Sequence, residues 1–74
     1  MTELEWIDLD SSTVANAAYD PDLEVIYVRF RDGAAYSYDQ CPPHVWEEFT
    51  APGQSPGKYL NETLRHKPYQ KLDG

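Results

Sequence analysis

The stretch from residue 23 to residue 39 constrains the fold most, because it has the pattern of two strands joined by a tight turn. Residues 23–31 read LEVIYVRFR, which is rich in β-branched and aromatic residues and too short for a helix of ordinary length. Asp32 and Gly33 then form a turn signal, and AAYSYD at 34–39 supplies a second strand. We therefore expect an antiparallel β-hairpin at the centre of the fold.

Two registers of this hairpin are open, and they differ in the surroundings of the neighbouring tyrosines Tyr36 and Tyr38. A two-residue loop at 32–33 would place Tyr36 opposite Arg29 and Tyr38 opposite Tyr27. Tyrosine and arginine side chains would then share one face of the sheet, an arrangement that can stack on nucleic-acid bases. In this register the tyrosines form a binding platform.

A three-residue loop at 31–33, with its glycine in the left-handed conformation, would instead place Tyr36 opposite Val28 and Tyr38 opposite Ile26. The change of one residue turns every side chain of the strand to the other face. We favour this register, in which the two tyrosines are mainly structural. It gathers on one face, where helices can cover them, the apolar side chains Ile26, Val28, Phe30, Tyr36 and Tyr38.

Three further segments have recognisable patterns. SSTVANAAYD at 11–20 predicts a strand, ended by a turn that contains proline and aspartate. CPPHVWEEFT at 41–50 predicts a short helix with Pro43 at its first position. A second helix is expected over 55–67, with Ser55 as its N-cap and a proline directly after its end.

The order of these elements predicts an α+β domain: a three-stranded antiparallel β-meander followed by two short helices packed on one face. We divide the chain into an acidic N-terminal extension at 1–10 and one domain at 11–72. Residues 1–9 carry several large apolar side chains, so they form either an extra edge strand or a docked tail.

Length and composition restrict the class of protein. A chain of 74 residues has room for one core, and its 10 aromatic residues supply much of the apolar surface to be buried. The single cysteine, Cys41, cannot form an internal disulfide, which favours a reducing compartment. No apolar run approaches the ~20 residues of a membrane helix, and the acidic N-terminus is unlike a secretory signal. We expect a single-domain cytoplasmic protein.

Charge is distributed unevenly along the chain. Residues 1–49 hold 11 acidic and 2 basic side chains, whereas residues 50–74 hold 2 acidic and 4 basic ones. The formal net charge of −7 argues against non-specific binding of nucleic acid, which depends on Lys and Arg contacts to phosphate. Any site for a polyanion is therefore expected to be local and towards the C-terminal end.

The start of the second predicted helix is a candidate site for an anion or a nucleic acid. The free backbone N–H groups that follow Ser55 would point at a ligand, and Gly57 would let it approach. Lys58 lies in the same turn, and Arg65 and Lys67 lie further along. The alternative is that this motif only caps and starts the helix.

A second candidate is the face of the hairpin that carries Tyr27, Arg29 and Arg31, because arginine and tyrosine side chains can stack on single-stranded bases. Neighbouring carboxylates offer these arginines a purely structural role as partners in exposed ion pairs. If the face is largely apolar around Leu23 and Val25, it would instead dock a protein or form a homodimer.

No constellation of residues predicts catalysis, a metal or a cofactor. Ser11 and Ser12 have no evident histidine and acid partners, and we expect them to bond the backbone at the start of a strand. Cys41 and His44 have the spacing of metal ligands, with His66 as a third, but a structural zinc site needs four. We expect Cys41 to be a packed thiol and the protein not to be an enzyme.

An ordered set of five motifs resembles the KTSC domain, a small bacterial family named for its occurrence at the C-terminus of some lysyl-tRNA synthetases. The motifs are SSTVANAAYDP, LEVIYVRFRDG, YSY, a proline before a short helix, and SPGKYLNETLR, and together they cover residues 11–69. The resemblance implies a small α+β domain and, through the association with a synthetase, RNA binding. The family pattern falls on Ser11, Ser12, Tyr19, Phe30, Gly33, Tyr36, Tyr38, Ser55, Gly57, Tyr59, Asn61 and Arg65.

We therefore expect a non-enzymatic binding or accessory module whose partner is RNA or a protein associated with tRNA. The alternative is a protein–protein interaction module that recruits a basic partner through its acidic N-terminal half. The sequence leaves the oligomeric state open.

Overall fold

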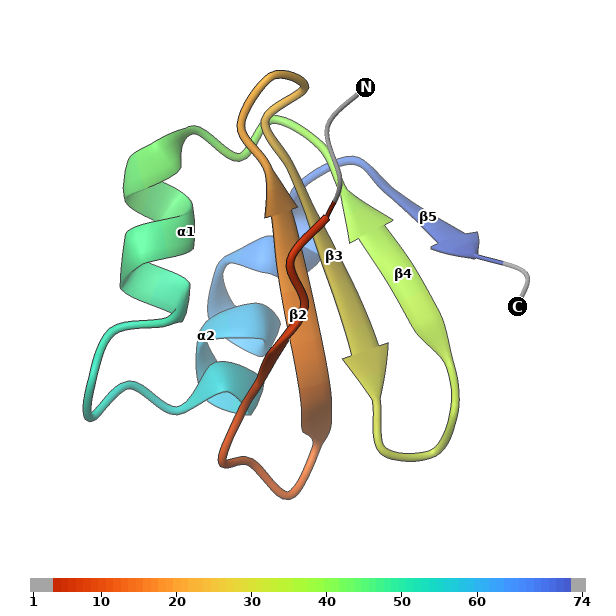
Figure 1. Cartoon of the computed structure of the whole chain (residues 1–74), viewed down its shortest axis with the longest axis vertical. Coiled ribbons are helices and arrows are strands. Elements are labelled where there is room, and N and C mark those ends of the chain that lie inside the picture. Colours follow the sequence, from red (N-terminus) through yellow and green to blue (C-terminus); the bar gives the residue numbers. More distant parts are fainter. Residues whose placement is uncertain (1–3, 73–74) are drawn as a thin grey trace.

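The computed structural model describes residues 4–72, which form one antiparallel sheet with two helices on one side (Figure 1). The sheet order follows the chain order, β1-β2-β3-β4-β5, and every neighbouring pair is antiparallel. The strands are β1 (Ile7–Asp8), β2 (Val14–Asp20), β3 (Val25–Phe30), β4 (Ala35–Tyr38) and β5 (Tyr69–Leu72). Between β4 and β5 the chain forms α1 (Pro43–Phe49), α2 (Pro56–Glu62) and the 3₁₀ turn η1 (Leu64–His66).

The central hairpin has the predicted three-residue loop, which confirms the favoured register. Tyr36 lies opposite Val28, and Tyr38 lies opposite Ile26. The hairpin is closed by the N–H of Phe30, which donates to the carbonyl of Ala34 at 2.8 Å. Gly33 has φ +99°, a backbone conformation that side-chain-bearing residues rarely adopt. The turn chemistry and the apolar pattern thus agree on which face the tyrosines share.

The predicted α+β class is confirmed, but the expected count of three strands is wrong because the sheet has five. β1 comes from the N-terminal segment and takes the edge-strand form, one of the two alternatives for residues 1–9; residues 1–3 lie outside the described part. β5 follows Pro68, whose carbonyl accepts a 2.7 Å hydrogen bond from the N–H of Asp39. Both added strands are short and mostly exposed, so neither has the apolar pattern that marks a strand in sequence.

The helices begin where the sequence predicts, but the second ends early. Ser55 is the N-cap of α2, and its hydroxyl accepts from the N–H of Lys58 at 3.5 Å. The expected single helix over 55–67 is instead α2 followed by the tighter turn η1. The turn lies where Leu64 enters the core with no exposed surface, and it leads the chain back to the sheet edge at β5.

One face of the sheet and the inner sides of the helices form the core. Tyr19 stacks on Trp46 of α1, with ring centroids 5.5 Å apart and an interplanar angle of 10°. The fully buried side chains of the core include Phe49, Ile26, Leu64, Val14 and Val28. Within residues 4–72, no helix has the length and apolar character needed to cross a membrane.

Candidate functional site

A hollow of about 370 Å³ lies on the helix-bearing side of the sheet and is lined by Phe30, Tyr36, Tyr38, Tyr69 and Arg65; we call it the aromatic hollow. Its position follows from the sheet being wider than the helices. α1 and α2 lie beside and behind β2 and β3, whereas β4 and β5 extend past them (Figure 1). The apolar face predicted from the hairpin therefore continues beyond its helical cover.

The rings of the aromatic hollow are packed mainly by tilted and edge-to-face contacts. Phe30 meets Tyr36 at 5.6 Å between centroids and 83°, and Tyr36 meets Tyr69 at 6.1 Å and 66°. Tyr38 is only 5% exposed, whereas Tyr69 is 60% exposed. Tyr38 thus forms a fixed floor and Tyr69 presents a ring to solvent, as stacking on a planar ligand requires.

The hollow combines neutral phenols with one guanidinium group. Burial raises the pKa of Tyr38 to about 12, with smaller contributions from the nearby phenols of Tyr36 and Tyr69, so its hydroxyl stays protonated at neutral pH. Arg65 is exposed, and one of its N–H groups meets the Asn61 side-chain oxygen at 3.4 Å. A guanidinium has five N–H donors, so Arg65 retains the capacity to bind an anion.

Further basic residues lie near the aromatic hollow. Lys71 of β5 is directly opposite Tyr36, so the two side chains share a face of the sheet. Lys67 precedes Pro68, at the point where the chain enters β5. Arg65, Lys67 and Lys71 thus all come from residues 50–74, which hold four of the six basic side chains of the chain.

The residues predicted at the start of the second helix lie on that helix, apart from the hollow. The Ser55 hydroxyl is engaged as the helix cap, and Lys58 is exposed. A Cβ atom placed on Gly57 would meet the Thr13 side chain at 3.4 Å. Thr13 therefore already occupies the space next to Gly57, into which a ligand would have to come.

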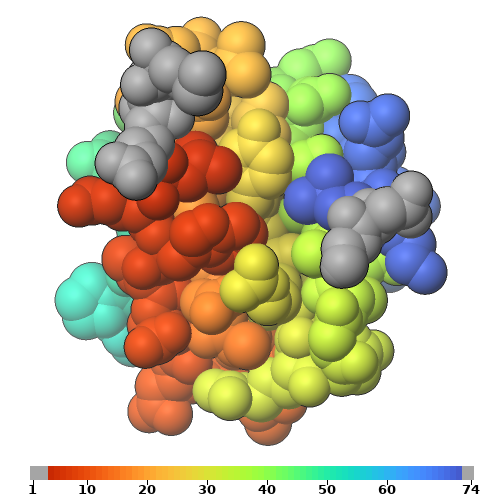
Figure 2. Space-filling model, turned by 45° about the vertical axis from the view of Figure 1, so that its right-hand side comes forward, coloured from red at the N-terminus to blue at the C-terminus, as the bar shows by residue number. Residues whose placement is uncertain are grey.

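The second predicted surface, with Tyr27, Arg29 and Arg31, is in contact with the chain's own N-terminal segment. The Arg29 guanidinium lies 4.7 Å from the centroid of the Trp6 ring, and Trp6 lies 6.5 Å from Tyr27. Arg31 donates to the backbone carbonyls of Ser11 and Leu9. In Figure 2 this segment, in red, lies alongside the β2 and β3 residues in orange and yellow.

Cys41 and Ser11, which were considered in sequence for metal binding or catalysis, have structural roles. The Cys41 thiol is fully buried and contacts the carbonyls of Tyr38 and Asp39 at 3.4 Å, and burial raises its pKa. The hydroxyl of Ser11 accepts from the N–H groups of Thr13 and Val14, which confirms that it bonds the backbone. Among residues 4–72, no group of three His, Cys, Asp or Glu side chains is placed to hold a metal ion.

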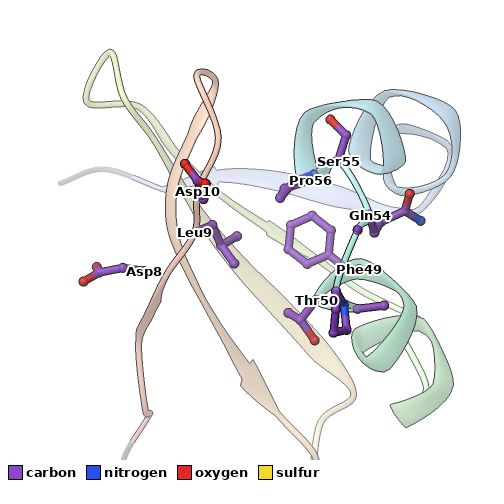
Figure 3. Close-up of a pocket in the computed structure, with 11 residues that line it drawn as sticks. Asp8, Leu9, Asp10, Phe49, Thr50, Gln54, Ser55 and Pro56 are labelled. Carbon is purple, nitrogen blue, oxygen red and sulfur yellow. The ribbon is translucent and has the colours of Figure 1, made fainter.

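A second hollow, of about 440 Å³, lies between residues 8–10 and the connection from α1 to α2. Figure 3 shows Leu9 lying towards the ring of Phe49, whereas Asp8 points away from it. Asp10 and the exposed part of the connection complete the rim. Its floor is apolar and the charged groups that line it are carboxylates.

Sequence reasoning identified Arg65, Tyr36 and Tyr38 but assigned them to different roles, and it did not consider Tyr69. The available signal for Tyr69 was an aromatic residue directly after Pro68, at the end of the segment that resembles the family. It became meaningful only once β5 was known to pair with β4, which places Tyr69 opposite Tyr38.

Comparison of sequences finds relatives of this chain. A protein of Tsukamurella paurometabola is 36% identical over 57 residues, which are 77% of this chain and 84% of that protein. An uncharacterized protein of Stutzerimonas stutzeri is 30% identical over 72 residues, covering 95% of this chain and 100% of the relative.

The fold is also present in a solved structure. The crystal structure of a KTSC domain protein from Yersinia pestis matches with a TM-score of 0.87 at 22% identity, over 96% of this chain and 100% of the other. The family model for the KTSC domain matches residues 10–69. The resemblance predicted from the five sequence motifs is thereby confirmed, and the chain belongs to the KTSC domain family.

Proposed function

We propose that this KTSC domain is a non-enzymatic binding module that takes single-stranded RNA in the aromatic hollow. One observation carries the proposal: Arg65 lines the same hollow as an exposed tyrosine, Tyr69, and two further tyrosines. An aromatic ring stacks on an unpaired base, and an arginine binds the phosphate beside it.

Electrostatics supports a local site. The chain as a whole is acidic, with a formal net charge of −7, and would repel a polyanion over most of its surface. Of its six Lys and Arg residues, Arg65 lines the aromatic hollow and Lys71 lies opposite Tyr36, and Lys67 comes two residues before Tyr69 in the chain. A strand of RNA would therefore be attracted to this part of the molecule.

The hollow is a better candidate than the opposite sheet face. There, Arg29 and Tyr27 already contact the Trp6 ring, so a base would have to displace the N-terminal segment before stacking. Arg31 is likewise engaged with backbone carbonyls. At the aromatic hollow, Tyr69 presents its ring without such a rearrangement.

The test is a titration with single-stranded RNA, followed by NMR, on the wild type and matched variants. Tyr69→Ala removes the exposed ring and is expected to weaken binding at least about fivefold, since stacking contributes about 1–3 kcal/mol per base. Arg65→Gln is expected to weaken it as well. Arg29→Gln removes the same charge from the opposite face and is the control, expected to leave the affinity within about twofold. A larger loss in Arg29→Gln than in Arg65→Gln would contradict the proposal.

A second candidate function is the recruitment of a basic protein through the acidic N-terminal half. It is favoured by the second hollow, where Asp10 borders an apolar floor. Such a site would take a lysine or arginine whose aliphatic stem packs on the floor. Binding of a lysine-rich peptide should then be weakened in Asp10→Asn and kept in Asp8→Asn, whose carboxylate points away from Phe49. An equal loss of peptide affinity in the test variant and its control would indicate non-specific charge attraction and contradict this second candidate function.

A further inference from the structure

We infer that the aromatic hollow accepts one nucleotide unit, a base bearing one phosphate, and does not track an extended strand. The inference rests on the proposed function and names the ligand more narrowly. It follows from the size of the hollow, the number of ring faces it offers and the placement of charge around it.

The hollow has room and ring surface for one base. Its volume is about 370 Å³, near the lower end of the ~300–1,000 Å³ range of small-molecule sites. Of its aromatic residues, Tyr69 is 60% exposed, whereas Tyr38 is 5% exposed and is held beneath its neighbours. Proteins that track single strands stack successive bases on successive rings, and this surface has a single largely exposed ring.

The charged side chains around the hollow also limit the number of phosphates that it can bind. Arg65 is the one cationic side chain that lines the hollow among residues 4–72. Beyond it, β4 is bounded by a carboxylate at each end: Asp32 in the turn before the strand and Asp39 directly after it. The Asp32 carboxylate is fixed there, since it accepts from the N–H of Ala34 at 2.9 Å.

Of the other basic residues, Lys71 lies opposite Tyr36 but does not line the hollow, and Lys67 has a carboxylate in the adjoining segment. Asp39 is hydrogen-bonded through its backbone to Pro68, the residue after Lys67, so a carboxylate and an ammonium group come from adjoining segments. On α2, Glu62 is exposed and lies one turn before Arg65. A strand that leaves the hollow along the sheet or towards the helix therefore meets negative charge, and a second or third phosphate gains little.

The experiment compares oligonucleotide lengths and salt dependence on the full chain. Uridine 5′-monophosphate and oligouridylates of three, six and twelve residues are titrated, and the affinity is expressed per nucleotide site. We expect the affinities of the trimer and dodecamer to agree within about threefold. Raising salt from about 50 to 200 mM should weaken binding only about threefold, the effect of one phosphate contact on a single strand.

Each outcome separates this inference from the proposed function. A rise in affinity of more than tenfold from trimer to dodecamer, with a loss of about 20-fold over the same salt range, indicates three phosphate contacts and overturns the inference while keeping RNA binding. Absence of binding by every RNA overturns both. If the monophosphate binds as tightly as the oligomers, the one-nucleotide site is supported and a free nucleotide is sufficient as its ligand. If the oligomers bind and the monophosphate does not, a single-nucleotide site is excluded.

Discussion

The tyrosines in the core between the helices and the sheet and those beyond the helices are used differently, although all lie on the same side of the sheet. The hydroxyl of Tyr19 donates to the carbonyl of Cys41 at 2.7 Å, and the hydroxyl of Tyr59 donates to the Glu48 carboxylate at 2.8 Å. In the aromatic hollow, the described contacts of Tyr36 and Tyr69 are between rings. The Tyr19 hydroxyl joins β2 to the segment before α1, and the Tyr59 hydroxyl joins α2 to α1. The tyrosines arranged around the hollow are instead available to a ligand.

Removal of a tyrosine ring should give the largest difference in stability between the two regions. Tyr59→Ala deletes a side chain that is 7% exposed, and we expect it to lower the free energy of unfolding by about 3–5 kcal/mol. Tyr69→Ala deletes one that is 60% exposed, with an expected cost below about 1 kcal/mol. Denaturant unfolding of both variants measures the difference. Equal losses would mean that the hollow is as structural as the core beneath the helices.

The sequence predicts an element well when the residues that indicate it are neighbours in the chain. The apolar positions of β3 and the turn at Gly33 fix the hairpin register, and Ser55 with Pro56 marks the start of α2. β5 could not be found in this way, because its YQKL segment is mostly exposed and pairs with a strand that precedes both helices.

The site was predictable only in part for the same reason. Arg65 stands out in sequence by its charge, and Tyr36 by its place on the apolar face. Their meeting with Tyr69 depends on the short helices leaving β4 and β5 uncovered, which is a property of the whole fold. Trp6 reaches Arg29 from the residue directly before β1, a strand of two residues that is too short for any periodic pattern.

Removing only a hydroxyl should give a smaller version of the same contrast. Tyr19→Phe and Tyr59→Phe each delete a hydrogen bond, with an expected loss of about 0.5–1.5 kcal/mol in the free energy of unfolding. Tyr36→Phe removes a hydroxyl whose residue is held by ring contacts and should change stability by less than about 0.5 kcal/mol. The same denaturant measurement applies. A Tyr36→Phe loss as large as that of Tyr59→Phe would remove the distinction between hydroxyl roles.

The contribution of Tyr59 to the free energy of unfolding should not change around neutral pH and should decrease in alkaline solution. Burial, followed by the bond to Glu48, raises the pKa of Tyr59 to about 12 from an ordinary value of 10.0. A raised pKa means that the protonated form is stabilised by folding, so this contribution is complete below pH 10.0 and is lost as pH rises towards about 12. Unfolding experiments across this interval should show a shallower decline in Tyr59→Phe than in the wild type; identical declines would show that Tyr59 does not contribute.

The most direct test of the account is to map where single-stranded RNA meets the domain by NMR, recording the backbone amide signals and the Arg65 side-chain signal during a titration. The account predicts that the largest shifts fall on Tyr36, Arg65 and Tyr69, with little change at Tyr27 and Arg29. Shifts centred on Tyr27, Arg29 and Trp6, with the signals of the aromatic hollow unmoved, would contradict it.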